Sequence, residues 1–199
     1  MDERTAAREQ ALSSSRRSIR SSANAIRAIH RGEFDDAHRL MDESRAAVDT
    51  GRNAVAGHPE IRYAGYLQDA EKEYAEARLT EALVTGAEPP TVDEVGVGVA
   101  PYLNGMAEAI GEGRRAVLDL LRRDQVDESE RILGGMEDIY YVLVSMDYPD
   151  AVTGNLRRST DVARSIIEKT RGDLSSALVQ RNLREALERH ADRFGGGSD

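Results

Sequence analysis

The feature that most constrains the fold is a set of long stretches in which apolar residues recur every three or four positions. Only 5 prolines interrupt the 199 residues. The stretches are rich in Ala, Leu, Glu and Arg, which keep most of their rotamer freedom in helices. Because this spacing places apolar side chains along one helical face, the sequence predicts a nearly all-α protein.

Glycines, prolines and polar loops divide this pattern into separate helices. Gly32 ends the first, and Gly57 with Pro59 separates the second from the third. The predicted helices cover about residues 5–31, 34–55, 59–84, 126–146 and 156–191, with one more between the third and the fifth that starts within 92–99 and runs to about 123. A break is expected near Gly172 in the last one. Its predicted inner face consists of Leu156, Val162, Ile166, Leu174, Leu178, Leu183 and Leu187.

The domain organisation predicted from this pattern is simple. With about 100–200 residues per domain, residues 1–194 are expected to form one domain, and the glycine-rich residues 195–199 a disordered tail. Three interior glycines, Gly105, Gly111 and Gly113, weaken the fourth helix by roughly 1 kcal/mol each, which usually marks close packing or a site that needs room. Tyr140, Tyr141 and Leu143 suggest more apolar surface than a monomer needs.

Charge and cysteine content exclude several classes. The 36 acidic and 27 basic residues give a net charge of -9, which argues against a uniformly basic nucleic-acid binder. The only lysines are Lys72 and Lys169. The absence of cysteine removes disulfides and thiolate metal sites. No signal-like segment and no run of about 20 apolar residues occur, so a cytoplasmic protein without a membrane span is expected.

Acidic residues form the first candidate site. Asp69, Glu73, Glu76 and Thr80 share one face of the third predicted helix, and Glu108 and Glu112 are neighbours on the fourth. If these faces pack together, four glutamates converge. Such an oxygen site suits Mg²⁺ or Mn²⁺ and metal-assisted cleavage of phosphodiesters.

A solvated acidic face is the alternative interpretation of these spacings. Because 36 of 199 residues are acidic, roughly one carboxylate in three has another at i+3 or i+4 by chance. Spacing alone therefore does not define a nuclease. The apolar residues beside Glu73, Glu76 and Glu108 place these acids near a packed boundary, which favours a site.

Arginines form a candidate nucleic-acid surface. On the first helix the stripe consists of Arg16, Arg20, Arg27 and Arg31, surrounded by serines, and could follow a phosphate backbone. Arg114 and Arg115 could hold a phosphate beside the metal. Pairing of these arginines with the excess acids is the alternative. The histidines, which are His30, His38, His58 and His190, have no mutual ligand spacing, and there is no phosphate-binding P-loop.

Four segments resemble the translin family, which comprises translin and translin-associated factor X. They are AIRAIHRGEF at 25–34, LQDAEKEYAEA at 67–77, VDEV leading into YLNGMAEAIGEGRRAVLDLL at 102–121, and LRRSTDVARSIIEKTRGDL at 156–174. The resemblance implies about seven helices in an antiparallel bundle, assembled into a closed homo-oligomeric shell, octamer-like or hexamer-like, that binds single-stranded RNA and DNA.

The resemblance also implies a catalytic site of the factor X type. In that type two glutamates lie in a Glu-Tyr-x-Glu-Ala context, as Glu73 and Glu76 do here, and two acids in an Asp-x-x-Gly-Glu context. Glu108 and Glu112 match the second pair, with Glu108 in place of aspartate. These members are Mg²⁺-dependent endoribonucleases, so the four glutamates are expected to be both catalytic and metal-binding.

Three functions are therefore carried forward. The first is a metal-dependent endoribonuclease of single-stranded RNA. The second is a non-catalytic translin-type protein that binds single-stranded nucleic acid. The third is a helical scaffold without a nucleic-acid role, which would show no salt-dependent binding of RNA.

Overall fold

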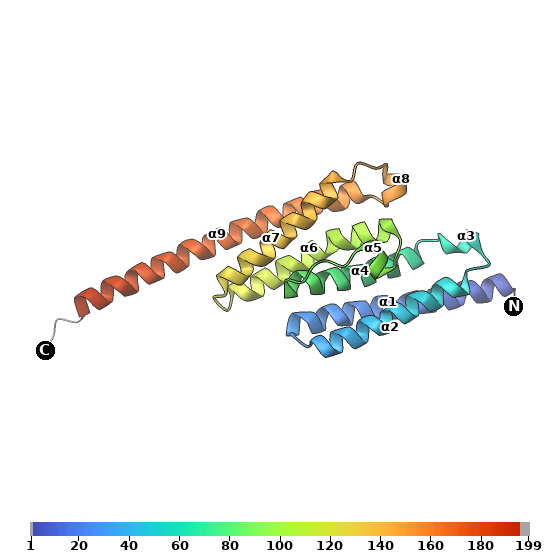
Figure 1. Cartoon of the computed structure of the whole chain (residues 1–199), viewed down its shortest axis with the longest axis horizontal. Coiled ribbons are helices and arrows are strands. Elements are labelled where there is room, and N and C mark those ends of the chain that lie inside the picture. Colours follow the sequence, from blue (N-terminus) through green and yellow to red (C-terminus); the bar gives the residue numbers. More distant parts are fainter. Residues whose placement is uncertain (1, 196–199) are drawn as a thin grey trace.

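The computed structural model describes residues 2–195, and every regular element within them is an α-helix (Figure 1). This confirms the all-α prediction. The long helices are α1 (Glu3–Arg31), α2 (Phe34–Ala54), α4 (Tyr66–Thr85), α6 (Val99–Leu121), α7 (Val126–Ser145) and α9 (Leu156–Gly195). Short helices in the connections are α3 (Pro59–Arg62), α5 (Val92–Val95) and α8 (Asp150–Thr153). None of the described helices is long and apolar enough to span a membrane.

The long helices lie in three pairs, α1 with α2, α4 with α6, and α7 with α9 (Figure 1). The α4–α6 pair is central, because α4 also contacts α1 and α2 while α6 contacts α7 and α9. Fully buried side chains such as Ile29, Leu79, Ile110 and Met136 join the pairs into one core. The two helices that carry the predicted acids therefore contact more of the other helices than any other helix does.

The predicted third helix is interrupted, so a continuous helix over 59–84 is wrong. Helix α3 ends at Arg62 and α4 begins at Tyr66. Between them Gly65 has φ of 92°, a conformation that side chains disfavour, and its N–H donates to the Gln68 side chain over 3.0 Å. The turn leaves Tyr63 largely exposed.

Helix α9 runs without a break from Leu156 to Gly195, so the break expected near Gly172 does not occur. The hydroxyls of Thr170 and Ser176, before and after this glycine, each donate a hydrogen bond to the backbone carbonyl four residues earlier in α9. Of the predicted tail, residue 195 ends the helix and residues 196–199 lie outside the described part of the chain.

Part of the predicted inner face of α9 is exposed. Val162, Leu183 and Leu187 are 52%, 59% and 60% exposed, in contrast to the buried Leu156 and Leu174. Leu183 and Leu187 are exposed because the C-terminal half of α9 extends past the other helices (Figure 1). Leu143, expected as surplus apolar surface, is instead buried in the core.

Serines, rather than large apolar residues, fill much of the contact between α1 and α2. The hydroxyls of Ser18 and Ser22 each lie 2.8 Å from the hydroxyl of Ser44. We call the buried serines that face the other helix the serine seam; it consists of Ser14, Ser18, Ser22 and Ser44. The serine seam is closed to solvent, so these hydroxyls cannot assist the α1 arginines in binding nucleic acid as the sequence suggested.

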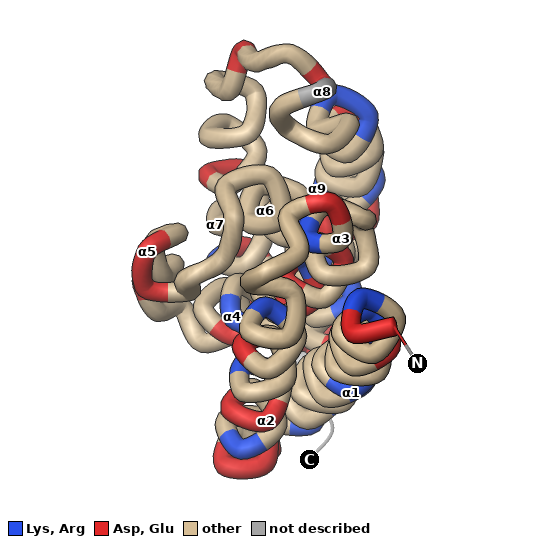
Figure 2. The backbone as a smooth tube through the Cα atoms, turned by 90° about the vertical axis from the view of Figure 1, so that its right-hand side faces the viewer, with Lys and Arg blue, Asp and Glu red and all other residues tan. Residues whose placement is uncertain are grey.

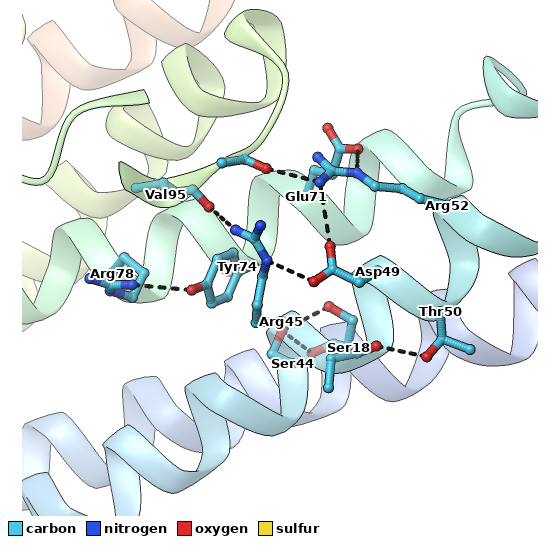
Figure 3. A network of polar contacts seen from close by, with 12 residues as sticks. Ser18, Ser44, Arg45, Asp49, Thr50, Arg52, Glu71, Tyr74, Arg78 and Val95 are labelled. Atoms are coloured by element: carbon cyan, nitrogen blue, oxygen red, sulfur yellow. Dashed lines mark hydrogen bonds and ion pairs between the residues drawn. The ribbon is translucent and has the colours of Figure 1, made fainter. Parts of the chain in front are cut away.

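A polar network fixes the start of α6 against α2 and α4 (Figure 3). Arg52 donates to Glu71 over 2.8 Å and to the carbonyl of Gly96 over 2.9 Å. Glu71 in turn accepts from the N–H of Gly98 over 3.0 Å, and Arg45 donates to the carbonyl of Val95. The loop that enters α6 is thereby held in place, which fixes the register of α6 on α4.

Candidate metal and nucleic-acid site

Three glutamates from the central helix pair converge. Glu73 and Glu76 on α4 and Glu108 on α6 each offer one carboxylate oxygen, and these oxygens all lie within 4.8 Å of one another. We call these three residues the carboxylate cluster. Acids that are 35 positions apart in sequence meet because α4 and α6 pack along their lengths.

Gly105 lets the two helices approach at this point. A Cβ atom there would lie 2.9 Å from the carbonyl oxygen of Lys72 and 3.0 Å from the amide nitrogen of Glu76. These distances are shorter than ordinary van der Waals contacts, so only glycine fits without a shift of backbone. Of the interior glycines of α6, Gly113 is also confined, but by the side chains of Leu83 and Met136 rather than by backbone. The expectation of close packing is met at both.

Burial makes the carboxylate cluster electrostatically costly. Glu76 is only 8% exposed, and its pKa is raised to about 8, first by desolvation and then by the charges of Glu108, Glu73 and Glu112. Desolvation also raises the pKa of Glu73. A cation bound between these oxygens would relieve both effects, because it would stabilise the ionised carboxylates.

Lys72 supplies one such charge from the protein itself. Its Nζ lies 2.6 Å from Glu108 and 3.4 Å from Glu73. Interaction with Glu108 raises the pKa of this half-buried lysine despite desolvation, so the ammonium stays charged. One of only two lysines in the chain therefore lies at the edge of the carboxylate cluster.

Glu112, the fourth predicted acid, lies outside the three converging oxygens. Its Oε2 accepts a hydrogen bond from Nε2 of His30 over 2.5 Å, and this bond lowers the pKa of Glu112. The His30 side chain is 5% exposed. Glu112 is still close enough to raise the pKa of Glu76. Helix α1 thus orients an acid at the border of the cluster.

Two members of the carboxylate cluster, Glu76 and Glu108, line a cleft of about 390 Å³ between the central pair and α9. Its walls are formed by Glu76, Ala107, Glu108, Gly111, Arg158, Ser159, Val162 and Ile166. A second cleft of about 550 Å³ shares Glu108, Arg158 and Ser159 with it and also contains Asp69 and Lys72. We call the two together the α9 cleft. Asp69 thus lies beside the cluster, whereas Thr80 is buried without a hydrogen-bond partner among the described residues.

The predicted basic residues do not gather at the carboxylate cluster. The exposed stripe on α1, formed by Arg16, Arg20, Arg27 and Arg31, lines neither part of the α9 cleft. Arg114 donates to Thr170 over 3.1 Å and pairs with Asp173 at 2.8 Å. Arg115 lies 3.8 Å from Glu112. Figure 2 shows acidic and basic segments mixed over the helices rather than separated by side.

Three residues at the site were not singled out from the sequence as its parts. His30 was noted only as one of four scattered histidines, yet it holds Glu112. Lys72 was noted only for its rarity, which was the available signal. Arg158 stands in the last segment that resembles the translin family, and the structure places it across the cleft from Glu76 and Glu108.

The donor set fits a hard divalent cation. All three groups are carboxylates, without the imidazole or thiolate ligands that favour zinc or copper, and Mg²⁺ or Mn²⁺ prefers such oxygen donors. Desolvation, and then the charges of the neighbouring glutamates, raise the pKa of the buried Glu76, and a bound cation would offset both. Fold and site together define the class of protein: it is an all-helical bundle with a carboxylate cluster beside an open cleft.

Comparisons with known proteins agree with this class. No protein-family model matches the chain. AfC3PO, whose structure is known alone and in a complex with duplex RNA, is 33% identical, with a TM-score of 0.82 over 90% of this chain and 93% of AfC3PO. Apo-NeC3PO shares the fold, with a TM-score of 0.79 at 20% identity over 87% of this chain and 90% of its own.

A relative of similar length is also known. The uncharacterized protein MJ0175 of Methanocaldococcus jannaschii is 35% identical over 185 residues, which are 92% of this chain and 81% of MJ0175. Since C3PO proteins are of the translin type, the chain belongs to the translin family.

Proposed function

We propose that this protein is a metal-dependent endoribonuclease that cleaves single-stranded RNA inside a homo-oligomeric shell, in the manner of the factor X branch of its family. The observation that carries the proposal is the carboxylate cluster, in which Glu76 is buried and all three carboxylates are within 4.8 Å. A solvated acidic face would not bury one of its acids at the floor of a cleft.

The proposed roles follow from the positions of the side chains. Glu73, Glu76 and Glu108 would hold Mg²⁺ or Mn²⁺, and Glu112, oriented by His30, would complete the acidic site. When bound, such an ion activates water and stabilises the charge that develops on the phosphate. Lys72 pairs with Glu108 at 2.6 Å and limits repulsion among the acids.

Binding of the RNA backbone is assigned to arginines. The exposed stripe of Arg16, Arg20, Arg27 and Arg31, with Arg115, is proposed to contact phosphates. Arg114 also belongs to the proposed surface, although it is already bound to Thr170 and Asp173. The known complex of AfC3PO with duplex RNA supports an RNA ligand for this protein, whose preferred strandedness is part of the test.

The deciding experiment is an RNA cleavage assay with Mg²⁺ or with EDTA, on the wild type and on Glu73→Ala/Glu76→Ala. We expect the double variant to lose cleavage, by about 100-fold or more, because removal of metal-stabilising groups costs several kcal/mol in the transition state. Labelled single-stranded and duplex RNA are supplied in parallel. Cleavage that survives both EDTA and the double substitution would contradict the proposal.

Two controls separate loss of chemistry from loss of fold. Glu130→Ala removes an exposed acid on α7, away from the cleft, and should cleave as the wild type does. Glu76→Gln keeps the size of the buried side chain and should still bind RNA in a gel shift while failing to cleave it.

The translin family comprises translin as well as the factor X type, and this favours a second candidate function, that of a non-catalytic protein that binds single-stranded RNA or DNA. The pairing of Lys72 with Glu108 supports it, since an ammonium already neutralises part of the acidic charge. This alternative predicts a gel shift with intact RNA after long incubation with Mg²⁺ or Mn²⁺.

A further inference from the structure

The α9 cleft has a wall that repels phosphate. Its acidic residues are Glu76 and Glu108, with Asp69 in the larger part and Glu73 next to the first two, and Lys72 is engaged with Glu108 at 2.6 Å. An RNA phosphate therefore needs a cation on the opposite wall to remain in the cleft.

Arg158 is the guanidinium that lines both parts of the α9 cleft. Lys72 is the other basic residue there, and it lines only the larger part. The side chain of Arg158 is exposed and has neither an ion pair nor a hydrogen bond within residues 2–195. By contrast, Arg114 is bound to Asp173 and Arg115 lies near Glu112. The N–H groups of the Arg158 guanidinium are therefore available to donate hydrogen bonds to a ligand.

The start of α9 is held in a defined position opposite the acids. The Ser159 hydroxyl donates to the side chain of Asn104 over 2.9 Å, and Asn104 donates to the carbonyl of Thr153 over 2.7 Å. Asn104 lies one turn before Glu108 on α6. The hydrogen bond from Ser159 thus ties the turn that carries Arg158 to the turn that carries Glu108.

The electrostatics of the helix end act in the same direction. Arg158 lies in the first turn of a 40-residue helix, whose N-terminal end carries partial positive charge. Asn155, which precedes the helix with φ of 66°, also lines the larger part of the cleft. A guanidinium gives paired hydrogen bonds that match the oxygens of a phosphate.

We propose that Arg158 is the phosphate anchor of the α9 cleft, which binds an RNA backbone phosphate opposite the carboxylate cluster and so holds the strand against it. This inference rests on the proposed function for its ligand. The role assigned to Arg158 is binding and positioning of the strand, and it can be measured without cleavage.

The test uses the full-length protein, EDTA and a fluorescein-labelled oligouridylate, whose binding is followed by anisotropy over a series of salt concentrations. Arg158→Ala should bind about tenfold more weakly, since it loses hydrogen bonds to a charged group. The slope of log affinity against log salt should fall by about 0.7, as expected for one phosphate contact to a single strand. Arg158→Lys should restore most of the slope and part of the affinity.

Arg157→Ala is the matched control. Arg157 precedes Arg158 on the same helix, is also exposed, and lines a different cleft with Leu143 and Tyr148. It should bind the oligonucleotide within twofold of the wild type. Light scattering on each variant checks that the assembly is unchanged.

The outcomes separate the two proposals. Equal weakening by Arg157→Ala and Arg158→Ala, or an unchanged salt slope in Arg158→Ala, would overturn the anchor even if the wild type cleaves RNA. A wild type that binds but never cleaves would overturn the nuclease and leave the anchor supported by its binding data. No binding of oligouridylate by the wild type would overturn both.

Discussion

Glu76 is a buried acid whose ionisation opposes folding in the metal-free protein. Its pKa of about 8 lies above the ordinary value of 4.5, because desolvation and neighbouring carboxylates disfavour the charged form. The protonated form is therefore the one that the folded state prefers. The stabilisation of the fold that protonation of Glu76 provides is fully present below pH 4.5 and is lost as the pH rises through about 8.

We expect the metal-free wild type to lose stability relative to Glu76→Gln between these two pH values. The slope for one proton is at most about 1.4 kcal/mol per pH unit, and coupling to Glu73 and Glu108 will spread it. Urea unfolding in EDTA at several pH values measures the difference. Parallel curves for the two proteins across this range would show that Glu76 is ionised in the fold without cost.

The acids of the site could be predicted as candidates, but their arrangement could not. Helical spacing places Glu73 and Glu76 on one face of the third predicted helix and Glu108 and Glu112 together on the fourth, and the resemblance to the translin family matches the same four residues. Which oxygens converge depends on how α4 packs on α6. Partners such as His30, 82 residues from Glu112, depend on contacts between helices that local spacing does not encode.

At the scale of helices, Gly105 sets the distance between α4 and α6 at the carboxylate cluster. A methyl group there would press on the backbone of Lys72 and Glu76, which cannot move as a side-chain end can. Gly105→Ala should therefore separate the two helices and shift Glu108 relative to Glu76.

The expected result is a loss of about 1–3 kcal/mol in the free energy of unfolding, as for other overpacked contacts. Weaker binding of Mn²⁺ should accompany it. Chemical denaturation and titration with Mn²⁺ measure the two effects. Gly134→Ala, on α7 with open space around it, is the control and should stabilise by about 0.5–1 kcal/mol. If Gly105→Ala and Gly134→Ala changed the free energy of unfolding and the binding of Mn²⁺ alike, close approach of the helices at Gly105 would not be the cause of the loss.

Helix boundaries illustrate what local pattern can and cannot predict. The end of α1 at Gly32 and the span of α7 follow the sequence closely. The break before α4 was missed because residues 59–84 keep helical periodicity across Gly65. The break expected at Gly172 does not form, since one helical glycine costs little within a helix of 40 residues.

At the scale of the whole molecule, α9 carries an apolar stripe that no described helix covers. Val179, Leu183 and Leu187 follow at intervals of four residues, and each is at least 59% exposed. Such a stripe is typical of a surface that packs against another copy. We attribute to it a part in the proposed homo-oligomeric shell.

Leu183→Glu/Leu187→Glu should reduce the size of the assembly, because two charges would be buried in an apolar contact. Sedimentation velocity measures the change. Asn182→Glu is the control: residue 182 is turned by about 100° around the helix from Leu183, so its charge lies off the stripe and should leave the assembly intact. An unchanged assembly in the leucine variant would place the contact elsewhere on the protein.

The serine seam gives the α1–α2 contact its own dependence on temperature. Hydrophobic stabilisation weakens on cooling, and exposure of apolar surface is what raises the heat capacity of unfolding. The contact between α6 and α7, built on Ile132, Met136 and Leu143, is of that kind. The seam instead buries hydroxyls bonded to one another, such as Ser22 to Ser44. Its exposure adds little to the heat capacity of unfolding, so we expect the hydrogen bonds of the serine seam to weaken less on cooling than the apolar contact between α6 and α7 does.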